Sequence, residues 1–358
     1  MKKGNKGEWS ELYVFFKVLA DKLLFPGDAN LNIRAGHFYP IVEVQRKEGG
    51  VDKTYTLTPM HVIVDKNGPS PKLVKYAVFQ AEAASLLNAI KTSSATFSVP
   101  RAENFLNSIG GTQIKADSSL KADIVIQVHD SRTNLQRILG FSIKSKLGGA
   151  STLLNAGHTT NFVFKINGPI MTPSDMRRIN AITTRNKIRD RVNEILTHGS
   201  TLEYKECENP IFNNNLIMVD SSLPSILANA LKLFNEKGIS SLPVLTQDLE
   251  TANPLGFDQR HNHKFYGMKI KRFLSEVALG MMPNKVWSGQ YNSTEGYIIV
   301  KSDGELVCYH IIEKNLFEDY LLANTKLETA STSRHGFGTI YQIGSEYFIN
   351  LNLQIRFV

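Results

Sequence analysis

Hydrophobic residues near the N-terminus of the chain recur at helical spacing. Apolar positions three and four residues apart place one face of a helix against a core, and here they are Leu12, Phe15, Phe16, Leu19 and Leu23. The pattern therefore predicts a helix over residues 8–24. Asn5 precedes it as a candidate N-cap, and Glu8, three positions further on, completes the spacing of a capping box.

Alternating and continuous apolar runs predict strands and further helices along the rest of the chain. The strands expected are residues 38–45, 55–64, 122–128, 138–144, 161–166, 296–301, 305–312, 337–343 and 346–357. The helices expected are residues 76–91, 100–110, 173–198, 222–236, 266–280 and 314–323. This mixture predicts an α/β architecture, with a division near residue 205 into two regions, 1–205 and 206–358.

Composition and charge narrow the class of protein. A chain of 358 residues is long enough for roughly two domains. A hydrophobic fraction of 42% beside 21% charged residues is typical of a folded globular protein. The net charge of +8, from 41 Lys and Arg against 33 Asp and Glu, favours polyanionic partners such as nucleic acid.

Cysteine usage and apolar run length indicate the compartment. Cys207 and Cys308 lie far apart and outside any CxxC motif, so we expect neither a disulfide scaffold nor a zinc site. Lys17 interrupts the apolar run of residues 14–20, and no run reaches membrane-spanning length. We therefore expect a cytoplasmic protein with no membrane partner.

Candidate chemistry lies on the two expected strands 122–128 and 138–144. Asp123 stands at the head of the first strand, and Lys144 near the end of the second. With the period of two in a strand, Ser142 and Lys144 share one face, while Phe141 and Ile143 point into the core. Carboxylate and carbonyl oxygens suit Mg²⁺, and a nearby lysine orients water or neutralises charge on a phosphate. The layout predicts a Mg²⁺-dependent phosphodiesterase site that includes the Ile143 carbonyl.

This layout resembles the core of PD-(D/E)XK nucleases, with Ala122-Asp123 as the first element and Ser142-Ile143-Lys144 as the second. Ser142 replaces the usual acidic residue, so the site lacks one metal ligand there. No acidic residue lies between Lys144 and Asp175 to replace it. The resemblance therefore directs attention to the N-terminal helix.

Two glutamates of the N-terminal helix, Glu8 and Glu11, are candidates for the missing ligand. Nucleases that this chain resembles often bring a glutamate from their first helix to the metal. Glu8 has an alternative role as the capping-box residue, whereas Glu11 has none, so Glu11 is the first choice. Gln127, on the same strand face as Asp123, is a further candidate oxygen donor.

The chain also resembles the HpaII-type restriction endonucleases along its full length. The residues that carry the resemblance are Gly7–Tyr13, Phe141–Asn155, Thr160–Phe162 and Thr325–Gly338. The resemblance implies a type II enzyme that cuts duplex DNA at the palindrome CCGG, after the first cytosine, with Mg²⁺. It also implies a homodimer on DNA, a protecting methyltransferase as functional partner, and a restriction-endonuclease-like core of mixed sheet and helices. We expect residues 1–205 to form that core and the α+β region 206–358 to contribute to DNA recognition.

Residues 325–338 have the composition of a DNA-contacting segment, with small hydroxyl residues, glycines and cations. Arg334 is our candidate for a bidentate contact to guanine, and Glu328 for accepting from cytosine N4. The other candidate DNA contacts are Lys326, Ser331, Ser333, His335, Lys146 and Asn155. An exposed polar loop is the alternative interpretation of this segment. The arginines of residues 173–198 likewise suit either a phosphate-binding ridge or an ordinary solvated helix face.

Two other functions stay open at this stage. Ser142 is consistent with a sequence-specific DNA-binding protein on a decayed nuclease scaffold, because loss of a ligand weakens metal binding. A repair or junction nuclease of the same fold would keep the same catalytic residues. Restriction predicts DNA ends that share one short sequence, whereas a junction nuclease cuts according to DNA structure.

Overall fold

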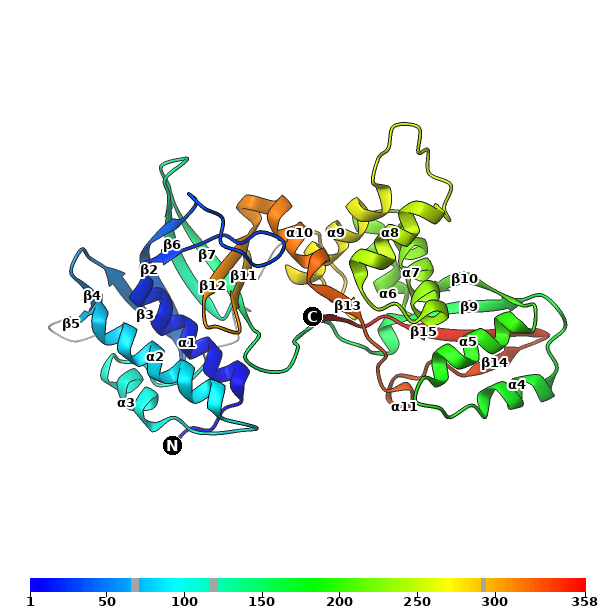
Figure 1. The fold of residues 1–358 in the computed structure, drawn as a ribbon, viewed down its shortest axis with the longest axis horizontal. Helices are drawn as coiled ribbons and strands as arrows, with labels where there is room; N and C mark the ends of the chain where they lie inside the picture. The colour runs from blue at the N-terminus through cyan, green and yellow to red at the C-terminus, as the bar shows by residue number, and fades with distance from the viewer. Residues whose placement is uncertain (66–70, 116–121, 291–293) are drawn as a thin grey trace. The chain divides into compact units, whose positions relative to one another are not determined.

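The computed structural model describes residues 1–65, 71–115, 122–290 and 294–358 (Figure 1). By its internal contacts the chain divides into two units. The first comprises Met1–Ser151 and Tyr291–Tyr320, and the second comprises Thr152–Gln290 and Leu321–Val358. The boundary expected at residues 205 and 206 falls within a strand of the second unit and is replaced by this division. The reason is that residues 296–310 return to the sheet of the first unit.

The first unit is built on a mixed sheet whose described strands follow the order β12-β11-β7-β6-β2-β3-β4-β5, with β1 paired to β2. β7 and β11 run parallel, and the other neighbouring pairs are antiparallel. The strands are β1 (Leu23–Leu24), β2 (Tyr39–Glu48), β3 (Val51–Leu57), β4 (His61–Val64), β5 (Lys72–Lys75), β6 (Ile124–Asp130), β7 (Leu135–Ser145), β11 (Gly296–Val300) and β12 (Leu306–His310). The prediction of a mixed α/β architecture is confirmed.

Helix α1 (Lys6–Asp21) lies between α2 and the sheet, with contacts to β1, β2, β7 and β11. Its side chains Trp9, Leu12 and Phe16 are fully buried. The predicted capping box forms, since Asn5 accepts from the Glu8 N–H and Glu8 accepts from the Asn5 N–H. The other helices here are α2 (Tyr76–Thr92), α3 (Pro100–Ser108) and α10 (Lys314–Ala323), in which the chain passes to the second unit.

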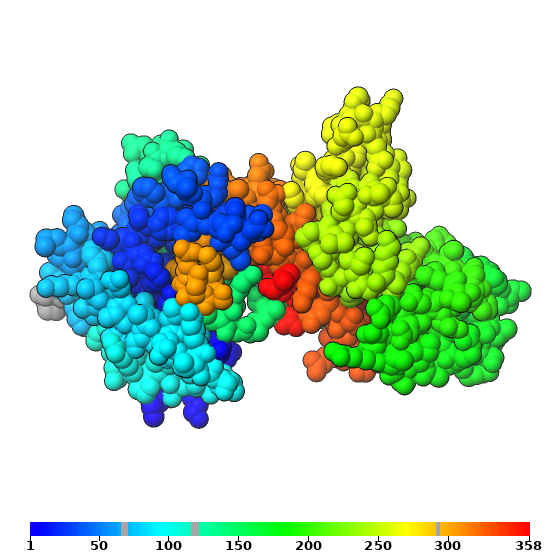
Figure 2. All heavy atoms as spheres, in the orientation of Figure 1, coloured from blue at the N-terminus to red at the C-terminus, as the bar shows by residue number. Residues whose placement is uncertain are grey.

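The second unit contains two smaller sheets with the strand orders β10-β9-β15-β14 and β13-β16-β8. The strands are β8 (Thr152–Leu154), β9 (Asn161–Asn167), β10 (Thr201–Cys207), β13 (Thr325–Leu327), β14 (Ile340–Ile343), β15 (Glu346–Asn352) and β16 (Ile355–Phe357). The helices are α4 (Pro173–Asn180), α5 (Lys187–Thr197), α6 (Pro210–Val219), α7 (Leu223–Lys237), α8 (Leu242–Ala252), α9 (Phe265–Ala278) and the single turn α11 (Thr332–His335). The exposed connection of residues 253–264 projects between α8 and α9 (Figures 1 and 2).

The helix expected over residues 173–198 is interrupted at residues 181–186, which separates α4 from α5. A buried arginine of α5, Arg191, stabilises the interruption. Its guanidinium donates to the carbonyls of Asn180 and Ile182 at 2.6 and 2.8 Å and to that of Gly338 at 2.6 Å. These bonds satisfy carbonyls that the end of α4 leaves free, and they place Arg185 and Lys187 at a turn.

The strand expected over residues 346–357 is also divided, because β15 pairs with β9 and β14, whereas β16 pairs with β13 and β8. In the described part of the chain no single helix is long and apolar enough to cross a membrane. Only α6 and α7 together reach that length, and the pair is bent by 108°.

Candidate active site

Asp123 and the C-terminal part of β7 are joined directly. The Asp123 N–H donates to the Phe141 carbonyl at 2.9 Å, and the Asp123 carboxylate accepts from the Ile143 N–H at 2.7 Å. Because β6 and β7 pair with Ile124 opposite Phe141, Asp123 stands at the start of β6 beside the residues that lead to Lys144. The predicted alternation is present only in part. Phe141 is fully buried and Ser142 and Lys144 are half-buried, but Ile143 is also only partly buried, although it packs against the core.

Glu11 of α1 lies near both Asp123 and Lys144. Burial, and next the negative charge of Asp123, raise the pKa of Glu11 to about 7. The pKa of Asp123 is also raised, mainly by burial. Burial lowers the pKa of Lys144, and the charges of Asp123 and Glu11 oppose this shift. The structure therefore brings two carboxylates and one amine from distant parts of the sequence into one electrostatic cluster.

A cavity of about 370 Å³ opens beside this cluster, wholly within the first unit. Among the residues that line it are Glu11, Ile143 and Lys144, together with the glycines Gly148 and Gly149. Ser10 and Ser145 are joined by a hydrogen bond of 2.8 Å between their hydroxyls. This bond links α1 to the end of β7, and it thereby fixes Glu11 relative to Lys144.

Glu8 occupies a different environment from Glu11. Its carboxylate accepts from the Asn5 N–H at 2.8 Å and forms an ion pair of 2.9 Å with Lys115. The hydrogen bond from Lys115, followed by that from Asn5, lowers the pKa of Glu8. Glu8 therefore has its charge compensated by the protein, whereas Glu11 lines the cavity. The geometry favours Glu11 over Glu8 as a metal ligand.

The residues present can be tested for their fit to a Mg²⁺ ion held by two carboxylates. Within the described ranges, no three His, Cys, Asp or Glu side chains are grouped to hold a metal. Mg²⁺ commonly uses one or two carboxylates and completes its shell with water and phosphate oxygens. A cation bound near two half-buried carboxylates whose pKa values are raised stabilises their charged forms. Glu11 and Asp123 therefore fit this ion.

Three residues near the cluster were not predicted from the sequence. The Lys144 amine lies 5.0 Å from the ring centroid of Tyr297 on β11, a cation–π contact. The positive charge of Lys115 lowers the pKa of both Glu11 and Asp123. Lys6 lines the cavity. Tyr297 lies far along the chain, so no local pattern indicates it, whereas Lys6 stands in the same helix as Glu11.

The remaining residues predicted for the site and for DNA contact are distributed over both units. The side-chain nitrogen of Gln127 donates to Gln136 on β7, and this bond does not involve the Gln127 oxygen predicted as a ligand. Lys146 is exposed directly after β7 in the first unit. Asn155 is exposed after β8 in the second unit, which also contains residues 325–338.

Residues 325–338 contain two short elements, β13 and α11, on either side of an irregular stretch. Lys326 is half-buried on β13, where it pairs with Arg356 on β16. Glu328 forms an ion pair of 3.0 Å with Arg356, so a contact to cytosine requires exchange of this partner. Arg334 is exposed on α11, and the hydroxyls of Ser331 and Ser333 lie 3.4 Å apart.

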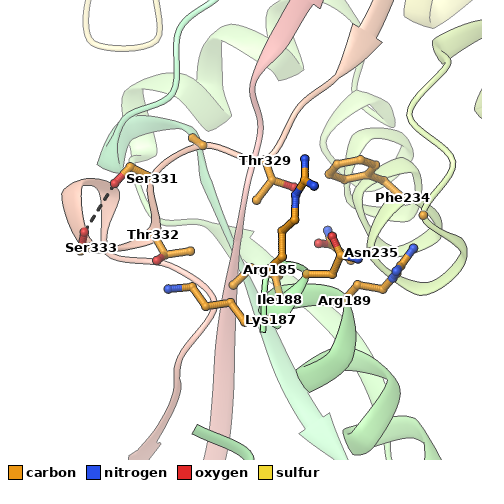
Figure 3. Close-up of a pocket in the computed structure, with 13 residues that line it drawn as sticks. Arg185, Lys187, Ile188, Arg189, Phe234, Asn235, Thr329, Ser331, Thr332 and Ser333 are labelled. Carbon is orange, nitrogen blue, oxygen red and sulfur yellow. Dashed lines mark hydrogen bonds between the residues drawn. The ribbon is translucent and has the colours of Figure 1, made fainter. Parts of the chain in front are cut away.

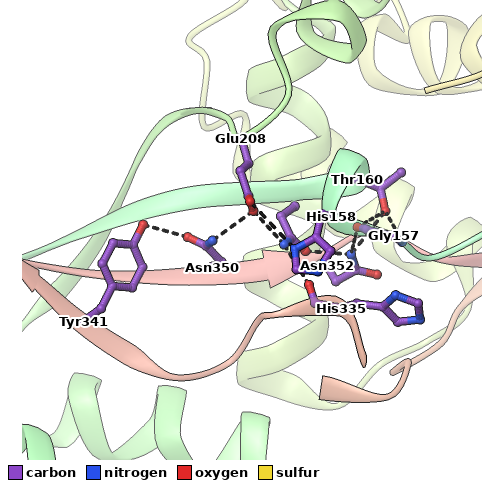
Figure 4. Close-up of polar contacts among 9 residues, drawn as sticks. Gly157, His158, Thr160, Glu208, His335, Tyr341, Asn350 and Asn352 are labelled. Carbon is purple, nitrogen blue, oxygen red and sulfur yellow. Dashed lines mark hydrogen bonds and ion pairs between the residues drawn. The ribbon is translucent and has the colours of Figure 1, made fainter. Parts of the chain in front are cut away.

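A polar network holds the far end of this segment (Figure 4). The Asn161 amide donates to Glu208 at 2.7 Å and to the His335 carbonyl at 3.0 Å. Asn350 donates to the same Glu208 oxygen at 3.1 Å. Gly336 has a φ of +61°, and a Cβ there would lie 2.6 Å from the imidazole of His158. The network and this close approach fix the backbone next to Arg334.

Comparisons with known proteins identify the family of the chain. A model of the HpaII restriction endonuclease family matches residues 5–357. The type II restriction enzyme HpaII of Haemophilus parainfluenzae is 44% identical over 359 aligned residues, which cover 99% of this chain and 98% of that enzyme. No solved structure matches the chain. At this identity the chain is a relative of that enzyme and distinct from it. The chain belongs to the HpaII restriction endonuclease family.

Proposed function

We propose that this restriction endonuclease hydrolyses phosphodiester bonds of duplex DNA with Mg²⁺, on a first unit of the PD-(D/E)XK type. The observation that carries the proposal is the cluster of Glu11, Asp123 and Lys144 beside the 370 Å³ cavity. Each member alters the pKa of another, and perturbed pKa values of this kind concentrate at catalytic sites.

The metal ligands in this proposal are Asp123, Glu11 and the Ile143 carbonyl. When bound, Mg²⁺ supplies Lewis-acid polarisation of the phosphate and a lowered pKa for water. Ser142 stands where related nucleases carry an acidic ligand, and Glu11 replaces that carboxylate from α1. Glu8 keeps its capping role.

Lys144 orients the attacking water and offsets the charge that develops on the phosphate. Its burial lowers its pKa, so the amine gives up a proton more readily than an exposed lysine. The neighbouring Tyr297 ring and Asp123 restrict where the amine can lie.

The second unit is proposed to recognise the DNA. Arg334 reads guanine, and Lys326, Glu328, Ser331, Ser333, His335, Lys146 and Asn155 are the other proposed contacts. We infer cleavage at CCGG, after the first cytosine, by a homodimer matched to the two-fold symmetry of the palindrome. In the cytoplasm a methyltransferase of the same specificity would protect the host DNA.

Digestion of plasmid DNA tests the proposal directly. The protein is incubated with plasmid in Mg²⁺ and, as a control, in EDTA, and the termini of the products are sequenced. Discrete fragments that require Mg²⁺ and end in a common CCGG-derived sequence are expected. Cleavage governed by junctions or flaps would favour a repair nuclease.

Ser142 is the specific feature that favours the second candidate, a DNA-binding protein without cleavage activity. That function predicts intact plasmid under all metal conditions together with a shift of CCGG duplexes in a gel. Introducing an acidic residue by Ser142→Asp further distinguishes the endonuclease from the DNA-binding protein without cleavage activity. If Glu11 has replaced the ligand, the variant gains little, whereas a decayed site regains cleavage.

A further inference from the structure

The second unit contains a cavity of about 480 Å³ whose lining is distinct from that of the proposed active site (Figure 3). It lies between the first turn of α5, the C-terminal end of α7 and residues 329–333. Its cations are Arg185, Lys187 and Arg189, and no acidic residue is among the residues that line it. In Figure 3 Arg185 extends between Thr329 and Phe234, while Lys187 points toward Thr332.

The three cations have no compensating partners among the described residues. Arg185, Lys187 and Arg189 form no ion pair and no side-chain hydrogen bond there. Neighbouring arginines behave differently, since Arg178 is paired with Glu194 and Arg191 is bonded to buried carbonyls. Three like charges around one hollow repel one another, and an anion bound between them relieves that repulsion.

The other groups that face the cavity are also suited to an anion. Thr329, Ser331, Thr332 and Ser333 form one wall, and the hydroxyls of Ser331 and Ser333 lie 3.4 Å from one another (Figure 3). The opposite wall is the start of α5, where Asn186 makes no side-chain capping bond. The acidic residue of that first turn is Asp190, whose carboxylate accepts a hydrogen bond from the Thr184 hydroxyl. Asp190 keeps its negative charge and offsets part of the helix dipole, but it does not line the cavity, so the positive potential there comes mainly from the three cations.

We propose that this cavity binds a backbone phosphate of duplex DNA, and that Arg185, Lys187 and Arg189 form a phosphate clamp. The inference rests on the proposed function and deepens it, because it assigns DNA affinity to residues outside the base-reading segment. A phosphate suits the lining better than an extruded base. A base would need aromatic rings to stack on, and Phe234 is the one aromatic residue among those that line the cavity. A base would also need free amide groups, and the side-chain nitrogen of Asn235 already donates to the Leu231 carbonyl.

The position of the clamp explains how affinity and specificity are combined. Residues 329–333 include Thr332 and Ser333, the first two residues of α11, and Arg334 follows them in the same helical turn. A strand held by its phosphate against Thr332 and Ser333 is therefore held next to the side chain proposed to read guanine. Phosphate contacts fix register and carry no sequence information, whereas base contacts carry it.

Binding measurements on the full-length protein test the clamp. The affinities of wild type and variants for two duplexes of equal length, one with CCGG and one without, are measured by fluorescence anisotropy. Ca²⁺ replaces Mg²⁺ to prevent cleavage, and the salt concentration is varied. Removal of one charge-assisted contact by Arg185→Gln, Lys187→Gln or Arg189→Gln is expected to weaken binding to both duplexes by about tenfold. The triple variant is expected to lower the slope of log Kd against log salt by about one.

Arg177→Gln is the matched control, because Arg177 is an exposed cation on α4 that does not line the cavity. It removes the same charge and should change affinity by less than about twofold. A second variant, Thr332→Glu, places a carboxylate among the three cations. It is expected to weaken DNA binding while leaving the Tm equal to or above that of wild type.

Each outcome decides between the clamp and its rivals. A triple variant that binds both duplexes like Arg177→Gln, with an unchanged salt slope, overturns the clamp even if the enzyme cuts normally. Loss confined to the CCGG duplex also overturns it and assigns the cavity to base recognition. A wild-type protein that neither binds nor cuts duplex DNA contradicts the proposed function itself.

Discussion

The two cavities of this protein differ in the sign of the charge that is left uncompensated. In the first unit, Glu11 and Asp123 are half-buried carboxylates whose pKa values are raised mainly by burial, and the charge of Asp123 raises the pKa of Glu11 further. In the second, Arg185, Lys187 and Arg189 gather without an acidic partner. The first arrangement attracts a divalent cation, and the second attracts a phosphate. Catalysis and DNA binding are thus assigned to different residues, which can be altered separately.

The largest expected effect is the loss of cleavage in Asp123→Ala and in Lys144→Ala. Removing a ligand or an electrostatic stabiliser at a phosphoryl centre costs about 100- to 1000-fold or more in rate. DNA affinity in Ca²⁺ should change little, because neither residue belongs to the second cavity. Single-turnover cleavage rates and anisotropy measure the two quantities. Near-normal cutting by either variant removes that residue from the mechanism.

The next largest expected effect is the difference in cleavage rate between Glu11→Gln and Glu8→Gln. Glu11→Gln loses a metal ligand, so we expect cleavage to fall about 100-fold and to recover partly at high Mg²⁺. Glu8→Gln alters the capping box and the Lys115 ion pair, and cleavage should remain close to normal. Equal activity of the two variants would contradict the assignment of Glu11. Loss of activity in Glu8→Gln alone would reverse the two roles.

The same substitution at Glu11 is expected to stabilise the metal-free protein. Its pKa of about 7 lies above the ordinary value of 4.5. Between these values the folded state binds more protons than the unfolded state, so its stability falls as pH rises from about 4.5 to about 7. Glu11→Gln removes this penalty, with at most about 3 kcal/mol gained at pH 8 in EDTA. Urea unfolding at pH 5 and pH 8 measures the change in the free energy of unfolding. An equal change at both pH values would show that ionisation of Glu11 does not destabilise the folded protein.

The smallest expected effect is a loss of discrimination between CCGG and unrelated duplexes when Arg334 in the second unit is replaced. Arg334→Ala should cost about 1–3 kcal/mol in binding to a CCGG duplex and much less on an unrelated duplex. Comparison with Arg189→Gln sharpens the result, because the clamp variant should weaken both duplexes alike. Equal losses for Arg334→Ala on the two duplexes would make Arg334 a phosphate contact instead.

Much of the fold could be predicted because it depends on local patterns. The capping box of Asn5 and Glu8, the helix that follows, and the hairpin of β6 and β7 each depend on residues close in sequence. The hairpin alone places Asp123 beside Ile143 and Lys144. The role of these residues in cleavage remains a prediction, whereas their proximity is observed in the structure.

What the sequence determined by itself was therefore the local elements, their caps and the pair of residues on adjacent strands. Tertiary structure decided the rest. It paired β11 with β7, which placed Tyr297 against Lys144, and it buried Glu11 beside Asp123. It also divided residues 173–198 around the buried Arg191, which turned an expected ridge of arginines into one wall of a cavity. Periodicity reports which side of an element is buried, but not which distant element covers it, and pKa shifts and unpaired charges depend on that partner.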